Sequence, residues 1–192
     1  MRVTHLRRSD YRRQRWKNGG GWTTELAVSP HDPAGDFDWR VSIAEIESDG
    51  AFSTFPNCDR FIALLEGNGM RLEFDSAQPA LLERRLQFVE FAGEWKTYGS
   101  LLDGPVHDFN VIARRDRVQA EVLHRPLVGT MVFFAQTHWF VYLAAGQATL
   151  KHRDGSTSLA VGESLRLEPD GSADNAILEG GGELVLVKLT PR

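Results

Sequence analysis

The chain has 192 residues, and 22 Lys and Arg against 26 Asp and Glu give it a net charge of −4. With 42% hydrophobic residues, including 11 Phe and 5 Trp, it has enough apolar surface for a core, which excludes general disorder. These values predict one compact domain or two closely packed halves. Cys58 is the single cysteine, so an intrachain disulfide framework is excluded, and we interpret it as a small packed hydrophobe.

The first residues carry no apolar core of signal-peptide length. No stretch approaches about 18 consecutive apolar residues, so we expect neither a transmembrane helix nor a membrane partner. A single free cysteine fits a reducing compartment. The sequence therefore predicts a cytoplasmic protein.

The charge is unevenly distributed along the chain. Residues 1–17 hold seven basic residues against Asp10 alone, a local charge of +6, which leaves −10 for the remainder. A solvated edge segment is the simplest interpretation, since basic side chains discourage sheets from pairing edge to edge. The acidic remainder and the lack of a recognisable motif disfavour a nucleic-acid partner. A third interpretation is that Arg15, Trp16 and Lys17 lead into a small-anion site.

In chain order, the sequence predicts β-structure almost throughout. Helical periodicity is weak, and its best candidates are one short turn at residues 9–15 and a segment at residues 78–82. Short apolar runs, separated by Gly, Pro, Asn and Asp, predict strands at the spacing of a sandwich or barrel. These runs lie at residues 23–28, 39–44, 61–65, 86–91, 109–113, 130–134, 139–143, 148–151, 164–167, 176–178 and 184–189.

The second half of the chain faintly repeats the first. Residues 60–69 and 139–148 each read as an apolar strand, a Gly-centred hairpin turn and a return strand. Further along, residues 91–94 are echoed by residues 160–163, and each half then ends in another strand. This order suits a jelly roll, the double-stranded β-helix, and the repeat predicts a duplicated one, a bicupin.

The predicted boundary divides the chain into an N-terminal cupin-like barrel, residues 1–115, and a C-terminal cupin-like barrel, residues 116–192. The seam is expected within residues 114–126, and strands are free to cross between the halves. The sequence leaves open whether the chain forms a homodimer.

The histidines are scattered. None forms the His-x-His pair of a metal-bearing cupin, so we predict no metal site and no cofactor. They are His5, His31, His107, His124, His138 and His152.

Three local features are candidates for a binding site. The glycines at residues 19–21 form either an anion-binding nest or a hairpin that feeds the next strand, and the sequence leaves both open. Arg60 follows a loop rich in aromatic and turn residues, where a guanidinium can grip a carboxylate bidentately. The alternative for Arg60 is a salt bridge at the rim with Asp59 or Glu66. On the strand that follows Gly104, Asp108 and Asn110 share a face.

These features carry a resemblance to the HutD/Ves family. Five separated strings match its pattern in order over roughly residues 10–125, whereas the C-terminal third matches mainly in strand rhythm. The strings are Trp16-Lys17-Asn18-Gly19-Gly20-Gly21-x-Thr23-x-Glu25, residues 37–44, Asp49-Gly50-x-Phe52-Ser53-x-Phe55-Pro56-x-x-Asp59-Arg60, residues 64–69 and residues 104–111.

The resemblance implies a cytoplasmic bacterial bicupin with no established enzymatic reaction. Members often accompany the histidine-utilisation pathway, whose early intermediate is urocanate, and are thought to bind a small carboxylate and modulate the pathway.

Residue chemistry and resemblance together predict a ligand pocket in the N-terminal barrel. Arg60 would hold the ligand carboxylate, and Phe52 and Phe55 would cover a flat ring by stacking. Glu25 would hold Arg60, accept a ligand N–H or pair with Lys17. The remaining donors expected there are Lys17, Asn18, Thr23 and Asn110.

Three functions are compatible with the sequence. The first is a non-catalytic sensor of small carboxylates such as urocanate. The second is a metal-free enzyme acting on a histidine-pathway intermediate, with His107, Glu25 or Glu47 as acid or base. The third is a protein or nucleic-acid interaction module that uses the basic arm.

Overall fold

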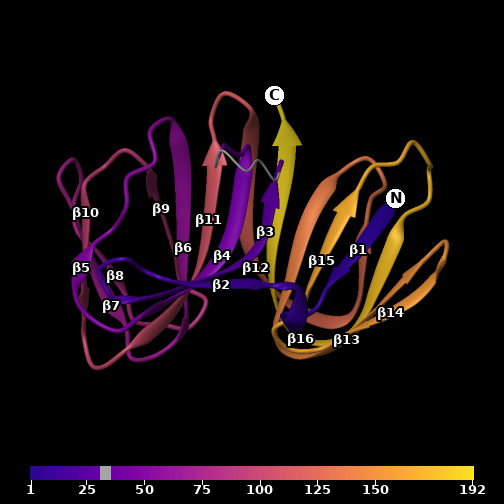
Figure 1. Ribbon diagram of the computed structural model, residues 1–192. Helices are drawn as coiled ribbons and strands as arrows, with labels where there is room; N and C mark the ends of the chain where they lie inside the picture. The colour runs from indigo at the N-terminus through magenta and orange to yellow at the C-terminus, as the bar shows by residue number, and fades with distance from the viewer. Residues whose placement is uncertain (31–35) are drawn as a thin grey trace. The chain divides into compact units, whose positions relative to one another are not determined.

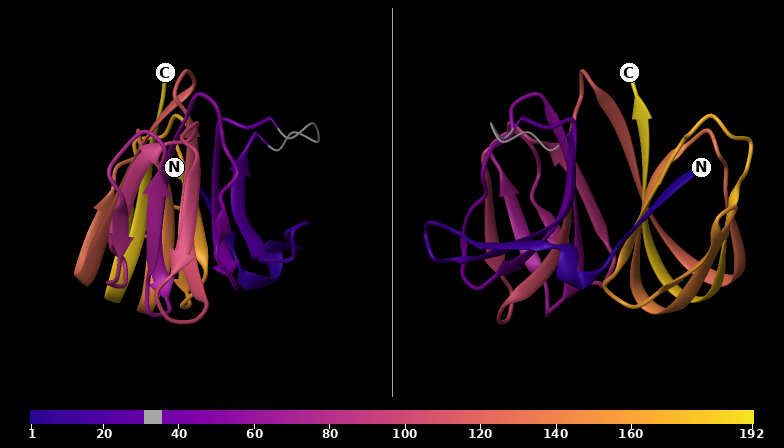
Figure 2. Two further views of the ribbon diagram at one scale, coloured as in Figure 1. Left: turned by 90° about the vertical axis from the view of Figure 1, so that its left-hand side faces the viewer. Right: turned by 45° about the vertical axis from the view of Figure 1, so that its right-hand side comes forward.

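The structure is a computed structural model that describes residues 1–30 and 36–192, so His31 lies outside the described residues. Contacts between residues divide the chain into two units. The N-terminal unit consists of residues 11–118 with Arg192, and the C-terminal unit consists of residues 1–10 and 119–191. The boundary expected from the sequence placed residues 1–10 with the first half, whereas β1 (Arg2–Leu6) pairs with β15 (Ser164–Glu168) of the C-terminal unit (Figure 2).

The N-terminal unit contains two sheets (Figure 1). The larger sheet has the order β2 (Arg12–Arg15), β3 (Gly21–Ser29), β4 (Trp39–Ile46), β11 (Val106–Arg114), β6 (Cys58–Glu66) and β9 (Phe88–Ala92). The smaller sheet has the order β5 (Gly50–Ala51), β10 (Thr97–Leu101), β7 (Met70–Phe74) and β8 (Ala80–Leu82). One apolar cluster joins Ile62 and Leu64 of the larger sheet to Met70 and Leu72 of the smaller one, so the two sheets pack as a sandwich rather than as a closed barrel.

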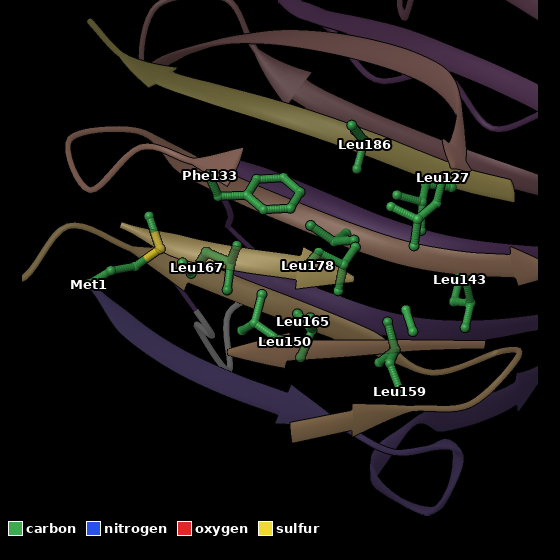
Figure 3. Packing of buried hydrophobic residues seen from close by; sticks show 14 residues of the cluster. Met1, Leu127, Phe133, Leu143, Leu150, Leu159, Leu165, Leu167, Leu178 and Leu186 are labelled. Atoms are coloured by element: carbon green, nitrogen blue, oxygen red, sulfur yellow. The ribbon is translucent and has the colours of Figure 1, made fainter. Parts of the chain in front are cut away.

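The C-terminal unit is built on one six-stranded sheet. Its order is β1, β15, β13 (His138–His152), β16 (Ala176–Pro191) and β12 (Val118–Phe133), with β14 (Gly155–Leu159) paired to β13. The sheet curls around a cluster of fully buried side chains such as Leu143, Leu165 and Leu178 (Figure 3). Every Leu of this cluster alternates with a residue on the opposite face, as the period of two in a strand requires.

The all-β prediction is confirmed. The helical candidate at residues 78–82 is wrong, and the one at residues 9–15 is a turn only at its start. The only helix among the described residues is a single 3-10 turn, η1 (Arg8–Asp10). Most of residues 9–15 form β2, which pairs with β3, and residues 80–82 form β8, which pairs with β7. Four or five residues of apolar spacing do not distinguish a helical turn from a strand, and the pairing with a neighbouring strand decides between them. No helix in the described part of the chain is long and apolar enough to cross a membrane.

Neither of the two predicted hairpins forms, and the chain takes a different path at each. The glycines at 67 and 69 connect β6 to β7, which belong to different sheets, so this turn is a corner between sheets rather than a hairpin. Around Gly146 the chain makes no turn, and β13 continues as one bent strand from its pairing with β15 to its pairing with β14. A bulge between Leu143 and Ala145 marks the bend.

The larger sheet of the N-terminal unit is buried on both faces. On β4, Val41 is fully buried and Ser42 on the opposite face is 4% exposed; on β11, Phe109 and Asn110 form the same kind of pair. Polar side chains on the inner face of this sheet therefore lie inside the unit, and they form the site described next.

Candidate functional site

The N-terminal unit contains a cavity of about 480 Å³ that is partly open to solvent, and this volume is within the range of small-molecule sites. Its walls come from β2, β3, β4, β5, β6, β11 and the loops next to them. The lining residues are Gln14, Arg15, Trp16, Lys17, Asn18, Gly20, Thr23, Arg40, Ser42, Ala44, Ile46, Ser48, Asp49, Gly50, Ala51, Phe52, Ser53, Phe55, Arg60, Asn110 and Ile112.

Strand register brings the polar lining residues together. Across the sheet, Arg40 of β4 and Arg60 of β6 lie on either side of Ile112 of β11. One row further, Ser42 is the partner of Asn110. Side chains at alternate positions share a face, so both rows point into the cavity.

Arg60 is the most deeply buried cation of the site, with 4% of its surface exposed. Its Nη1 donates to the carbonyl oxygen of Ser53 at 3.1 Å, and its Nη2 donates to Oδ1 of Asn110 at 3.2 Å. Its Nε has no hydrogen-bond partner among the described residues. Burial lowers the pKa of Arg60 to about 10, which leaves the group charged at neutral pH.

Three aromatic rings surround the Arg60 guanidinium. The centroids of Phe52, Phe55 and Phe91 lie 5.4, 5.3 and 5.1 Å from its central carbon, within cation–π range. Phe91 was not among the predicted residues, because in the sequence it is one apolar residue of a strand like many others. Phe52 and Phe55 line the cavity, and their stacking on a ligand ring stays a prediction.

Asn110 connects Arg60 to a second buried charge. Its Oδ1 accepts from Arg60, while its Nδ2 donates to Oδ1 of Asp108 at 3.3 Å. Asp108 is fully buried beside the cavity, and its Oδ2 has no partner in the described part of the chain. Burial raises the pKa of Asp108 to about 7, because the attraction of Arg60 and the hydrogen bonds from the Asn110 amide and the Ala44 backbone only partly offset the loss of hydration.

Arg40 is a second guanidinium of the cavity that the sequence reasoning missed. Its Nε lies 3.3 Å from Oε2 of Glu25, with each side chain 25% exposed. Its charge repels that of Arg60 and contributes to the lowered pKa of Arg60. Two cations in one cavity make an environment that favours an anion.

Glu25 is the one predicted site residue that does not line the cavity. It forms its ion pair with Arg40 rather than holding Arg60 or pairing with Lys17. The proposed rim salt bridges of Arg60 are also absent from the described residues, since Asp59 pairs with Arg115 and Glu66 with His107. Arg60 therefore has no carboxylate within ion-pair distance in this part of the chain.

The loop between β2 and β3 closes one side of the cavity. Trp16 donates from Nε1 to Oγ1 of Thr23 at 2.7 Å, and Asn18 accepts the backbone N–H of Gly20 at 3.1 Å. The backbone N–H of Gly19 is bonded to the carbonyl of Trp16. These donors are used within the loop, so the triple glycine is a hairpin rather than an open anion nest. Lys17 and Asn18 line the cavity from this loop.

Seven of the eight predicted ligand-binding residues thus surround one cavity. They are Lys17, Asn18, Thr23, Phe52, Phe55, Arg60 and Asn110.

The proposed acid–base residues lie elsewhere. His107 pairs through Nδ1 with Glu66 at 3.1 Å, Glu47 pairs with Arg15 at 3.3 Å, and neither His107 nor Glu47 lines the cavity. Among the described residues no group of three or more His, Cys, Asp and Glu side chains is arranged to hold a metal ion. Cys58 is buried, and burial raises the pKa of its thiol, which fits a packed hydrophobe.

Three of the seven basic residues of the arm, residues 1–17, form ion pairs with acidic groups among the residues that the structure describes. Arg2 binds Glu168, Arg13 binds Glu45, and Arg15 lies 3.3 Å from Glu47. The guanidinium groups of Arg13 and Arg15 also stack on the ring of Trp22. Part of the local +6 is therefore balanced by neighbouring carboxylates, which weakens the case for a nucleic-acid footprint.

Comparison with known proteins shows which family the chain is similar to. The family model described as HutD matches residues 8–186. A curated relative from Pseudomonas putida, named an uncharacterised 21.2 kDa protein in the hutC 3′ region, is 34% identical over 195 residues, covering 97% of each chain. Among solved structures, a conserved protein of unknown function from Pseudomonas aeruginosa PAO1 is similar with a TM-score of 0.89 and 30% identity, covering 98% of this chain and 99% of that one.

The structure of HutD from Pseudomonas fluorescens SBW25, in a formate condition, is similar with a TM-score of 0.85 and 30% identity over the full length of both chains. A conserved barrel domain protein of the cupin 2 type from Leptotrichia buccalis, with 9% identity and a TM-score of 0.58, shows the fold alone. The predicted cupin-type architecture is therefore confirmed, and the chain belongs to the HutD family.

Proposed function

We propose that this protein binds a small carboxylate of the urocanate type without transforming it, and that binding modulates histidine utilisation in the cytoplasm. The observation that carries the proposal is Arg60. It is a buried, charged guanidinium at the wall of a cavity, and its polar partners, Ser53 and Asn110, are both neutral.

A buried cation is costly because it has lost its hydration, and the buried carboxylate of Asp108 reaches Arg60 only through the Asn110 amide. A ligand carboxylate would place a negative charge in direct contact with Arg60 and form charge-assisted hydrogen bonds, which are about twice as strong as neutral ones. Arg40, on the same wall of the cavity, adds to the attraction, since its charge is only partly balanced by Glu25, whose side chain is 25% exposed and lies 3.3 Å away. We therefore expect a carboxylate to be more stable in the cavity, beside two guanidinium groups, than in water.

The remaining walls suit a flat ring attached to that carboxylate. Phe52 and Phe55 present aromatic surface beside Arg60, and Trp16 lies on the loop across the cavity. The link to histidine utilisation comes from the family and from the P. putida relative, whose name places it beside hutC.

The decisive experiment measures urocanate binding by calorimetry for the wild type and for Arg60→Gln. We expect saturable binding that weakens by about 2 kcal/mol or more in the variant, about thirtyfold, because a charged hydrogen-bonded partner is lost. Arg71→Gln is the matched control, since Arg71 is an exposed arginine of β7 paired with Glu73 outside the cavity. Urocanate should also be recovered unchanged after long incubation.

Absence of heat and of thermal stabilisation with urocanate and a panel of small carboxylates would overturn the proposal. Equal affinities of Arg60→Gln and wild type would overturn the role of Arg60.

Arg40→Gln provides a second, less disruptive test, because the Arg40 side chain is 25% exposed and Arg60 is nearly inaccessible. Removing one of two cations should weaken urocanate binding by about tenfold at low ionic strength, with a smaller loss as salt screens the field. The same titration in rising salt checks this. An unchanged affinity at all salt concentrations would show that Arg40 contributes nothing to anion binding.

A further inference from the structure

Asp108 is a buried titratable group that the proposed binding function leaves unused. It sits on β11, two residues from Asn110 and on the same face, but it does not line the cavity. One of its oxygens accepts the Asn110 amide at 3.3 Å, and the other is buried without a partner among the described residues. A carboxylate is thus held one side chain behind the guanidinium that faces the ligand.

The surroundings of Asp108 contain few charges. On β6 the charged group is Arg60, reached through Asn110, and on β4 it is Arg40, which faces Arg60 and pairs with Glu25 of β3. The register partners of Asp108 are Ala44 and Leu64, which belong to the apolar cluster shared with the smaller sheet. From that sheet the cluster receives only apolar side chains, such as Met70 and Leu72.

Two carboxylates would therefore compete for Arg60 when a ligand binds. Like charges that share one buried site cannot both stay ionised at low cost, and one of them takes up a proton. The ligand carboxylate has direct access to the guanidinium, whereas Asp108 reaches it only through the Asn110 amide. We therefore expect Asp108, rather than the ligand, to become protonated.

Resting on the proposed function, we propose that Asp108 takes up one proton when a carboxylate binds at Arg60, so that the cavity binds its ligand more tightly as the pH falls. The proton comes from the solvent and adds to a carboxylate oxygen of Asp108, with the unpartnered Oδ2 the less hindered site. No other bond forms or breaks, and the charge of the cavity is the same before and after binding. Asp108 acts through Asn110 and Arg60, and it touches no ligand.

The pKa of Asp108, about 7 in the free protein, puts this coupling near neutral pH. A bound anion raises that pKa further. At pH values between the pKa of Asp108 in the free protein and its pKa in the complex, linkage makes the ligand affinity fall about tenfold for each pH unit. Below the free value Asp108 is already protonated, and the affinity should level off.

The probe is 3-(2-furyl)acrylate, which keeps the flat ring and acrylate carboxylate of urocanate but has no group that titrates between about pH 6 and 9. Calorimetry in buffers of different ionisation heat counts the protons taken up. For the wild type we expect an uptake of about one proton above pH 7 and an affinity that falls with pH. Asp108→Asn should bind without proton uptake and with an affinity independent of pH.

Asp103→Asn is the matched control, because Asp103 is an exposed carboxylate that bonds Asn68 outside the cavity. It should keep the wild-type pH profile. Binding of the probe by the wild type with no proton uptake at any pH would overturn this inference while leaving the binding function standing, and so would identical pH profiles of wild type and Asp108→Asn. The wild-type proton count decides the matter even if the variant does not fold. Failure of the wild type to bind this or any small carboxylate would overturn both proposals.

Discussion

Asp108→Asn should be more stable than the wild type at neutral and alkaline pH, by about 3–4 kcal/mol on the plateau. The pKa of Asp108 is raised from 3.8 to about 7 by burial. A group with a raised folded-state pKa contributes its full stability below the unfolded value, near pH 4, and loses it as the pH rises through the folded value, near 7. A shift of roughly three units corresponds to about 4 kcal/mol.

Urea unfolding of both proteins at several pH values from about 4.5 to 8.5 measures this directly. The free energy of unfolding of the variant, relative to wild type, should increase with pH and then level off above pH 7. A difference in unfolding free energy that does not change with pH reflects only the replacement of a carboxyl group by an amide. The pH dependence of that difference is therefore the quantity that tests the prediction. Parallel curves would show that folding does not raise the pKa of Asp108.

This cost bears on function. A fully buried carboxylate that weakens the fold at neutral pH is hard to explain by stability alone, since an amide of the same shape would serve the packing equally well. The proposed proton uptake gives the carboxylate a role, because Asp108, coupled to Arg60 through Asn110, would keep the charge of the cavity constant when an anionic ligand binds. The stability and binding experiments therefore test one group from two directions.

Much of the site was predictable because it depends on local patterns. Arg60 follows a loop with two phenylalanines, and this local pattern predicts a cation beside aromatic rings, although the structure buries Arg60 in the cavity wall rather than leaving it at the mouth. Asn110 shares a face with Asp108 because strands alternate with a period of two. Both inferences need only the strand assignment, which the apolar runs supplied.

Arg40 and the burial of Asp108 depend on pairing between strands that are distant in the sequence. On β4, Arg40 and Ser42 alternate with Trp39 and Val41, which reads as a solvent face opposite a core face. In this sheet both faces are covered, so the polar alternate residues line an internal cavity instead. Arg40 comes near Arg60 because β4 and β6 both pair with β11 in a particular register. The periodicity of a single sequence does not predict that register.

Glycine patterns misled the sequence reasoning in a related way. Gly67 and Gly146 occupy equivalent places in the two repeats, yet the first is part of a connection between sheets and the second lies within a continuous bent strand. A glycine with positive φ marks a change of chain direction, but the neighbouring strand determines whether the chain turns or merely bends.

Gly146→Ala should cost about 2–5 kcal/mol of unfolding free energy, or prevent folding. Gly146 has φ +88°, and a methyl group on its Cα would overlap the carbonyl oxygen of Gly181 on β16, with Gly182 also in contact. Both atoms are backbone of the paired strand and cannot rotate away, so the ladder of β13 and β16 must separate at the bend. The cost combines left-handed backbone strain of about 1–2 kcal/mol with overpacking of about 1–3 kcal/mol.

Gly171→Ala separates these two contributions. Gly171 has φ +84°, nearly the same backbone conformation, but an added methyl group there would meet no atom within 4 Å. It should lose only the strain, about 1–2 kcal/mol. Chemical denaturation of the two variants beside wild type checks the difference. Equal losses would mean that β13 and β16 can yield at Gly146, and the bend would then be a consequence of glycine's flexibility rather than of close approach between the two strands.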